Sequence, residues 1–116
     1  MMSTDLHPVL SIRLFRDDKC FGSGVAQLLR LVQQHHSLRG AAIAMGMAYS
    51  KAWTVMRRCE EELGFPLLVY ATGGKNGGGA TVTPEAERLL TAYDRYCQRV
   101  QDLSKTVFLE EFQEFL

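Results

Sequence analysis

Two glycines, Gly46 and Gly64, each follow a short segment in which apolar residues have helical spacing. Ser37 can cap a helix over 39–45, and the three alanines of that segment allow close packing against a neighbour. A second helix is predicted over 49–63, where apolar residues recur every three or four positions. Two helices joined by a glycine turn form either a helix-turn-helix, whose second helix enters a DNA major groove, or an ordinary helical hairpin.

The segment that follows the helix pair favours the first alternative. An apolar run over 67–70 predicts a strand, and 81–82 can return as its antiparallel partner. The stretch 71–80 contains five glycines around Lys75 and Asn76, which predicts a long hairpin loop. A helix-turn-helix followed by such a hairpin is typical of a winged helix, whose loop reaches DNA phosphates or the minor groove.

The flanking segments complete a mainly α fold with a small antiparallel β wing. Alternating residues over 9–15 predict a strand with one apolar face, and an apolar stripe predicts a helix over 23–36. Thr83 followed by proline marks the start of a long last helix. We expect a winged helix-turn-helix domain over 9–83 and a C-terminal dimerisation helix over 84–116.

The last helix carries apolar residues at spacings of 4, 3, 4, 3 and 4. Such a heptad-like seam favours pairing with the same helix of a second chain, so we expect a homodimer. The alternative is packing against the first helix of the same chain. Phe108, Phe112, Phe115 and Leu116 form a further apolar cluster, which would be exposed in a monomer. The predicted dimerisation residues are Leu89, Tyr93, Tyr96, Val100, Leu103 and Val107.

Charge is distributed unevenly, although thirteen Lys and Arg balance thirteen Asp and Glu. Residues 37–83 are mildly basic and residues 84–116 are acidic, which suits a polyanion-binding centre beside a solvated or self-associating tail. The three glutamates 60–62 are interpreted as a solvated helix end, with Arg57 and Arg58 paired to the acids four positions later.

Motifs for other kinds of chemistry are incomplete. Lys75 is followed by Asn76, so the glycine-rich loop is no P-loop. His35, His36 and three scattered cysteines, among them Cys97, match no zinc spacing, and no catalytic constellation stands out. We therefore expect no enzyme, no cofactor and no metal site.

The expected location is the cytoplasm. No apolar run approaches the roughly 18 residues that cross a bilayer, so no membrane association is expected. The first eight residues lack the pattern of a signal peptide. An odd number of widely spaced cysteines fits reduced thiols better than a disulfide framework.

The segment 37–64 resembles the helix-turn-helix of LysR-type regulators. Residues 47–53, Met-Ala-Tyr-Ser-Lys-Ala-Trp, and the wing 71–80 with its following Thr-Pro resemble more closely the N-terminal domain of the ModE family of molybdate-responsive regulators, over residues 10–105. This resemblance implies a homodimer that binds a palindromic operator in double-stranded DNA. It also implies control of genes for molybdate transport or molybdoenzymes.

The DNA-binding hypothesis assigns roles by position. Ser50, Lys51 and Thr54 are expected at base edges and nearby phosphates, and basic side chains at the DNA backbone. Trp53 falls at the start of the second helix and is interpreted either as part of the interface or as a wedge between the two helices. The predicted DNA-binding residues are Arg39, Tyr49, Ser50, Lys51, Thr54, Arg58, Thr72, Gly74, Lys75 and Asn76.

Three departures from the ModE pattern bear on these expectations. Ala48 stands where the family usually has a capping serine, so the second helix lacks a side-chain cap at a cost of about 1 kcal/mol. The order Tyr49-Ser50-Lys51 replaces the commoner Tyr-Lys-Ser and would alter base readout. The 116 residues do not include the small β-barrels that bind molybdate in the family, so no molybdate site is expected in this chain.

A second function class remains open at this point. The acidic last helix and the Phe112 and Phe115 patch would also suit a winged helix that binds another protein and does not bind DNA.

Overall fold

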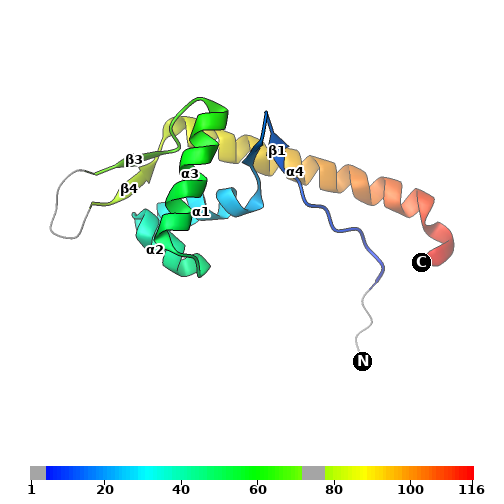
Figure 1. The fold of residues 1–116 in the computed structure, drawn as a ribbon. Coiled ribbons are helices and arrows are strands. Elements are labelled where there is room, and N and C mark those ends of the chain that lie inside the picture. Colours follow the sequence, from blue (N-terminus) through cyan, green and yellow to red (C-terminus); the bar gives the residue numbers. More distant parts are fainter. Residues whose placement is uncertain (1–4, 72–77) are drawn as a thin grey trace.

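The computed structural model describes residues 5–71 and 78–116. Figure 1 shows helices packed beside two short antiparallel hairpins, with one long helix that runs away from the body of the fold. This is the predicted winged helix-turn-helix with a long C-terminal helix. In chain order the elements are β1 (Leu14–Phe15), β2 (Lys19–Phe21), α1 (Ser23–His35), α2 (Leu38–Met45), α3 (Tyr49–Leu63), β3 (Leu68–Tyr70), β4 (Ala80–Val82), α4 (Pro84–Glu111) and the 3-10 turn η1 (Gln113–Phe115).

The helix pair α2 and α3 begins and ends at the signals in the sequence. The Ser37 hydroxyl accepts a hydrogen bond of 2.9 Å from the Gly40 N–H, which caps α2. Gly46 and Gly64 follow the two helices in the left-handed conformation, with φ of 69° and 84°. Ala48 provides no side-chain hydrogen bond at the start of α3, as the missing serine predicts.

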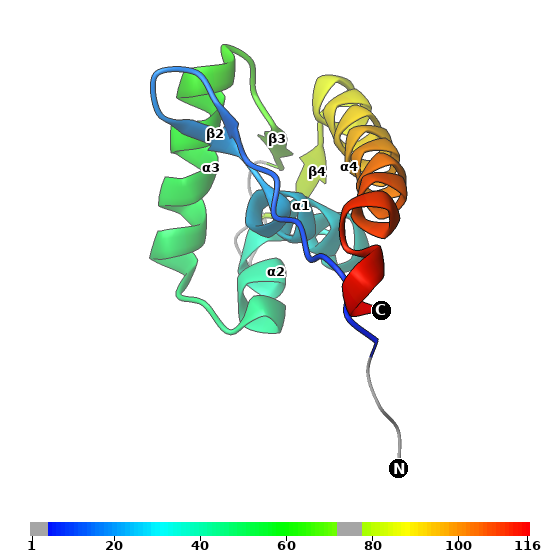
Figure 2. The same ribbon diagram turned by 90° about the vertical axis from the view of Figure 1, so that its right-hand side faces the viewer.

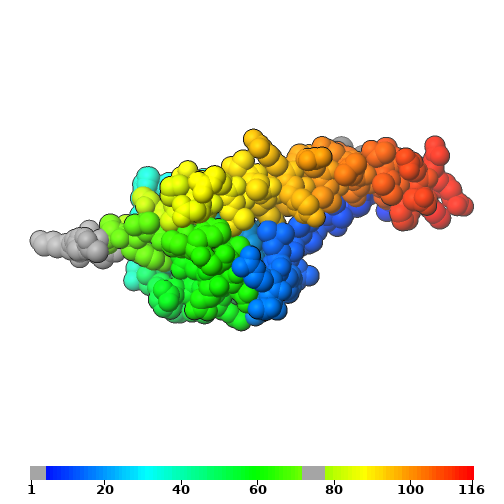
Figure 3. Space-filling view, turned by 90° about the horizontal axis from the view of Figure 1, so that it is seen from above, coloured from blue at the N-terminus to red at the C-terminus, as the bar shows by residue number. Residues whose placement is uncertain are grey.

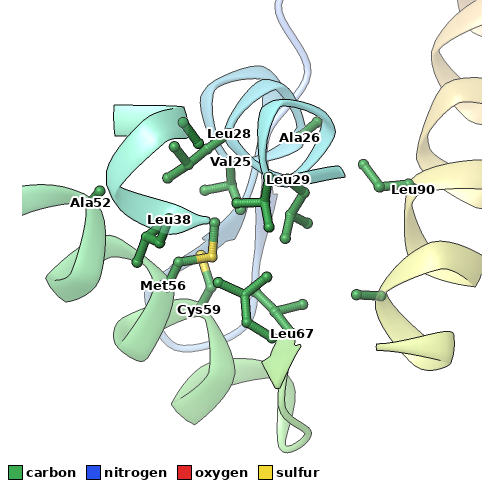
Figure 4. Packing of buried hydrophobic residues seen from close by; sticks show 14 of the residues in the cluster. Val25, Ala26, Leu28, Leu29, Leu38, Ala52, Met56, Cys59, Leu67 and Leu90 are labelled. Carbon is green, nitrogen blue, oxygen red and sulfur yellow. The ribbon is translucent and has the colours of Figure 1, made fainter. Parts of the chain in front are cut away.

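The core lies where α1, α2 and α3 meet, and Figure 4 shows its aliphatic and sulfur-containing side chains pointing toward one another. Leu28 and Leu29 come from α1, and Met56 comes from α3. Leu67 precedes β3 and is fully buried among them. The core positions α3 with one side inward and the opposite side toward solvent.

The first hairpin is shorter than the sequence predicts. Only residues 14–15 of the predicted strand 9–15 pair with β2, and the pairing is irregular between them. The predicted alternation holds only at Ile12 and Leu14, which are half-buried against the core. The carbonyl oxygen of Ile12 accepts a 2.8 Å hydrogen bond from the Tyr93 hydroxyl. A side chain of α4, in place of a partner strand, therefore holds this segment.

Helix α4 has two parts with different surroundings. The Thr83 hydroxyl caps its start, and Ala86, Leu90 and Tyr93 are buried in the core. The helix spans 28 residues, about 42 Å, so its later turns extend beyond the body of the fold. The boundary expected at residues 83 and 84 therefore marks the start of the helix, while core packing continues past it.

The molecule is elongated, with principal dimensions of 62, 37 and 21 Å. Figure 3 shows the β3–β4 hairpin and the last turns of α4 at opposite ends. Figure 2 shows α3 and α4 on opposite sides of α1. No helix in the described ranges combines the length and apolar character required to cross a membrane.

Candidate nucleic-acid interface

Helix α3 presents three kinds of surface outside the core. Ser50, Thr54 and Glu61 lie on its outward side and are exposed. The Thr54 hydroxyl donates to the Ser50 carbonyl oxygen over 2.9 Å, so the hydroxyl oxygen can act toward a partner only as an acceptor. We call α3 the recognition helix, the usual term for the second helix of a helix-turn-helix, and its polar side is exposed.

One flank of the recognition helix lies beside the β1–β2 hairpin. Lys51 and Arg58 are seven residues apart, two helical turns, and both are exposed. An Arg58 nitrogen lies 3.4 Å from an Asp18 oxygen. Since both side chains are largely exposed, the pair contributes little to stability and leaves Arg58 available to a phosphate.

The other flank carries two arginines held over aromatic rings. The Arg39 guanidinium carbon lies 4.3 Å from the centre of the Tyr49 ring. The Arg57 guanidinium carbon lies 5.4 Å from the centre of the Trp53 ring. Both distances are within the range of cation–π attraction, which holds each charge on this side of α3.

Trp53 does not act as a wedge between helices. Its side chain is 44% exposed, whereas a wedge would be buried. The small residues Ala41 and Ala42 of α2 and Ala52 of α3 are buried instead, in the core that the two helices share. The wedge interpretation is therefore wrong, and the indole belongs to the surface of the recognition helix.

A hollow of about 340 Å³ joins this flank to the base of the wing. Arg39 and Tyr49 line it from the helix side, and Tyr70 lines it from β3. Partial burial and the nearby Glu60 carboxylate raise the pKa of the Tyr70 hydroxyl, so the phenol stays protonated near neutral pH and can donate a hydrogen bond.

The wing is the hairpin of β3 and β4 with its loop, and its base is fixed to the helix-turn-helix. Leu68 pairs with Val82, and Tyr70 pairs with Ala80. The Ala80 N–H donates to the His36 carbonyl oxygen at the end of α1 over 2.8 Å. A side chain on Gly79 would come within 2.6 Å of that same oxygen, so glycine is required there by close backbone approach.

Four predicted wing contacts, Thr72, Gly74, Lys75 and Asn76, lie outside the described residues. The structure does place the remaining predicted DNA-binding residues on one connected surface. Arg39, Tyr49, Ser50, Lys51, Thr54 and Arg58 occupy the start of α2 and the sides of α3 that do not face the core.

Three residues at or near this surface have contacts that the sequence did not predict. Arg57 was expected to pair with Glu61, but it lies over Trp53. Glu60 was interpreted as a solvated residue. Its carboxylate instead accepts hydrogen bonds from the N–H groups of Leu67, at 2.8 Å, and Leu68, at 3.4 Å. Trp53 and Arg57 are four positions apart, which places them on the same side of α3 and could have indicated the contact between them. Nothing in the sequence indicated a functional role for Tyr70 except its position next to the glycine-rich loop.

The residues of the predicted dimerisation seam differ in burial. The first two pack against the core of their own chain, and the later ones lie beyond it. Tyr93 is buried in its own chain and makes an edge-to-face contact with Phe21, with ring centres 5.1 Å apart. Leu89 is half-buried against the same core. The later seam members Tyr96, Leu103 and Val107 are more than half exposed, and Val100 is half-buried.

In the C-terminal apolar cluster, Phe112, Phe115 and Leu116 are exposed, as expected, whereas Phe108 is half-buried. Phe108 and Phe112 stack with ring centres 5.0 Å apart, and Phe115 lies 6.3 Å from Phe112. Leu10 of the N-terminal segment lines a shallow groove with these later turns of α4. The apolar surface therefore extends from α4 onto the segment beside it.

The described residues hold no group of three His, Cys, Asp or Glu side chains that could bind a metal ion.

Comparison with known proteins identifies relatives named as transcriptional regulators and as molybdenum-pterin-binding proteins. The transcriptional regulator ModE of Haemophilus influenzae is 38% identical over 85 residues, which are 73% of this chain and 33% of that protein. The molybdenum-pterin-binding protein MopB of Rhodobacter capsulatus is 36% identical over 72 residues, 62% of this chain and 27% of that protein. The DNA-binding transcriptional dual regulator ModE of Escherichia coli is 34% identical over 71 residues, 61% of this chain and 27% of that protein.

These matches confirm the resemblance to ModE proteins, and the chain spans a third or less of the length of these curated relatives. A family profile described as bacterial regulatory helix-turn-helix protein, lysR family, matches residues 26–87. That range covers more than half of the chain and includes α2, α3 and both wing strands. The chain therefore belongs to the lysR family of bacterial regulatory helix-turn-helix proteins.

Proposed function

We propose that this chain is a sequence-specific DNA-binding regulator of transcription, with no enzymatic activity of its own. The observation that carries the proposal is the connected surface formed by the outward side of α3, the Arg39–Tyr49 pair and the base of the wing. A helix with an exposed polar side next to a hairpin fits a major groove and the adjoining backbone. The proposed site of action is the cytoplasm, where the bacterial chromosome lies.

Each part of the surface has a proposed role. Ser50, Lys51 and Thr54 contact base edges, because they lie at the exposed start of the recognition helix. Arg39 and Arg58 contact phosphates on either side of that helix. In the wing, Thr72, Gly74, Lys75 and Asn76 contact the DNA backbone or the minor groove.

The proposed targets are genes for molybdate transport or molybdoenzymes. Support comes from the names of the similar proteins, which include two ModE transcriptional regulators and a molybdenum-pterin-binding protein. The changed order at Ser50 and Lys51 leads us to expect an operator that differs from those of typical ModE proteins.

The proposed active form is a homodimer joined through α4. The exposed Leu103, Val107 and Phe112 make an apolar surface along its later turns. A second chain would cover this surface and place two recognition helices for the two halves of a palindromic operator.

Binding to DNA tests the proposal. Duplexes are selected from a randomised pool with the purified protein at about 0.1 M salt, and the affinity for the selected duplex is compared with that for a scrambled one. We expect tighter binding to the selected duplex by 10³-fold or more, which is the lower end of the usual range. Equal, weak binding to both would instead favour the protein-interaction module.

Two variants separate the roles of base and backbone contacts. Lys51→Ala is expected to change the order of preference among duplexes, because Lys51 is proposed to lie at base edges. Lys75→Ala is expected to weaken binding to every duplex and to lower the slope of log affinity against log salt by about 0.9. An unchanged slope would remove Lys75 from the backbone contacts.

The oligomeric state is tested separately by sedimentation. Leu103→Lys is expected to give monomers at concentrations where the unmodified chain is a dimer, because the charge would be buried in the interface. Thr91→Lys, on the exposed surface of an earlier turn, is the control and should leave the dimer intact. A monomeric unmodified chain would contradict the proposal.

A further inference from the structure

We propose that Trp53 determines part of the DNA sequence specificity by packing its indole against thymine methyl groups in the major groove. This inference rests on the proposed function and adds to it a residue with a defined chemical target. Three observations carry it: the exposure of the indole, its position on the recognition helix, and the arginine that covers one of its faces.

The contacts within residues 5–71 and 78–116 do not explain why Trp53 is exposed. Tryptophan is the largest side chain, and most of its surface is usually buried. Here 44% remains accessible, although α3 is packed against the core along its other side. An exposed aromatic ring at a surface that binds a partner is the usual sign of a contact residue.

The position of Trp53 matches the part of α3 that would face DNA. It follows Tyr49 by one helical turn and adjoins Ser50 and Thr54, which are exposed on the outward side. A recognition helix inserted through these polar side chains would bring the indole to the wall of the same groove.

The contact chemistry selects thymine. The major-groove edges of the four bases offer hydrogen-bond donors and acceptors, and the only apolar group among them is the C5-methyl of thymine. A largely apolar ring gains free energy by covering such a methyl and gains little beside a bare donor or acceptor. We therefore expect thymines at the operator positions next to Trp53.

Arg57 holds the indole of Trp53 in one orientation for this contact. Its guanidinium carbon lies 5.4 Å from the centre of the indole, so it covers one face and leaves the rest of the ring accessible. The cation–π attraction restricts the side chain before DNA arrives, which lowers the entropy lost on binding. Arg57 is thus a positioning residue for Trp53.

The test replaces thymine by deoxyuridine, which removes only the C5-methyl group. Each thymine of the selected duplex is replaced in turn, and the affinity of the full chain is measured by fluorescence anisotropy of labelled DNA. We expect about a fourfold loss at one or more thymines, from the burial of one methyl. With Trp53→Ala, the affinities for the thymine and deoxyuridine duplexes should be equal at those positions.

Matched variants distinguish the loss of the thymine contact from a loss of folding. Trp53→Phe keeps an aromatic ring and should retain part of the thymine preference. Phe15→Ala removes an aromatic ring that is 62% exposed on β1 and should leave the preference unchanged. Circular dichroism establishes that each variant is folded. In addition, Trp53 is the single tryptophan of the chain, so its emission should change when the selected duplex binds.

The outcomes separate the two proposals. If the unmodified chain binds the selected duplex but tolerates deoxyuridine at every position, the thymine contact is refuted and the regulator function stands. The same holds if Trp53→Ala retains the full deoxyuridine penalty. If the chain selects no duplex at all, the proposed function fails, and the inference fails with it.

Discussion

The guanidinium of Arg39 lies over the ring of Tyr49, which joins the first turn of α2 to the first turn of α3. The two residues are separated by the rest of α2 and the glycine turn, and neither is buried. In the proposed complex Arg39 contacts the DNA backbone while α3 reads the bases. The pair therefore fixes the spacing between a backbone contact and the helix that reads sequence.

Removing the ring of Tyr49 tests this coupling. Tyr49→Leu should weaken operator binding about two- to fivefold, since an exposed cation–π contact is worth about 0.5–1 kcal/mol. Tyr49→Phe keeps the ring and should bind nearly as well. The salt slope should stay unchanged in both, because Arg39 keeps its charge, whereas Arg39→Ala should lower it by about 0.9. A lower slope in Tyr49→Leu would show that Arg39 no longer reaches a phosphate.

The uncapped start of α3 offers a gain in stability. Ala48 has the extended conformation of a cap residue, with φ of −66° and ψ of 143°, but it has no side-chain acceptor. Ala48→Ser should raise the free energy of unfolding by about 1 kcal/mol, measured by urea denaturation. Ser37→Ala, which removes the existing cap of α2, should lower it by a similar amount. No gain in Ala48→Ser would mean that the new hydroxyl does not reach the free N–H groups of α3.

Local signals in the sequence were enough to predict most of the fold. The bounds of α3, the cap of α2 by Ser37 and the start of α4 after Thr83 were all predicted correctly. Each of these depends on a few neighbouring residues, such as a glycine after the helix or a hydroxyl before it. The outward side of α3 followed from the same periodicity.

Contacts between distant segments could not be predicted in this way. Tyr93 fits a heptad seam by spacing, but its hydroxyl binds the carbonyl oxygen of Ile12, which is 81 residues away. Trp53 and Arg57 were misjudged for a related reason. Periodicity places a residue on a side of a helix, but it does not tell which neighbour covers that side.

Glu60 connects the recognition helix to the wing, and its loss should be costly. The carboxylate accepts hydrogen bonds from the Leu67 and Leu68 N–H groups, at 2.8 and 3.4 Å. Glu60→Ala should lower the free energy of unfolding by about 1.5–3 kcal/mol, the range for a hydrogen bond to a charged group. Glu61→Ala, an exposed neighbour, is the control and should change it by less than about 0.5 kcal/mol. Equal effects of the two substitutions would contradict the structural role of Glu60.

Stability at high pH should depend on Cys59. Burial, with the neighbouring Cys20, raises the pKa of the Cys59 thiol from 9.0 to about 11 in the folded chain. The unfolded chain therefore loses this proton first as pH rises. The contribution of the Cys59 thiol to folding stability is full below about pH 9 and is lost between pH 9 and 11. The pKa values of Tyr70 and Tyr93 are also raised by burial, and these residues act in the same direction at somewhat higher pH.

Urea denaturation at fixed protein concentration, repeated from pH 7 to 11, measures this loss. Cys59→Ala should be less stable at pH 7, because it leaves a cavity, but its stability should fall less between pH 9 and 11. Val25→Ala is the control, since it also truncates a buried side chain and removes no titrating group. It should lose as much stability over that range as the unmodified chain does. If Cys59→Ala and Val25→Ala show the same fall, the thiol proton is not linked to folding.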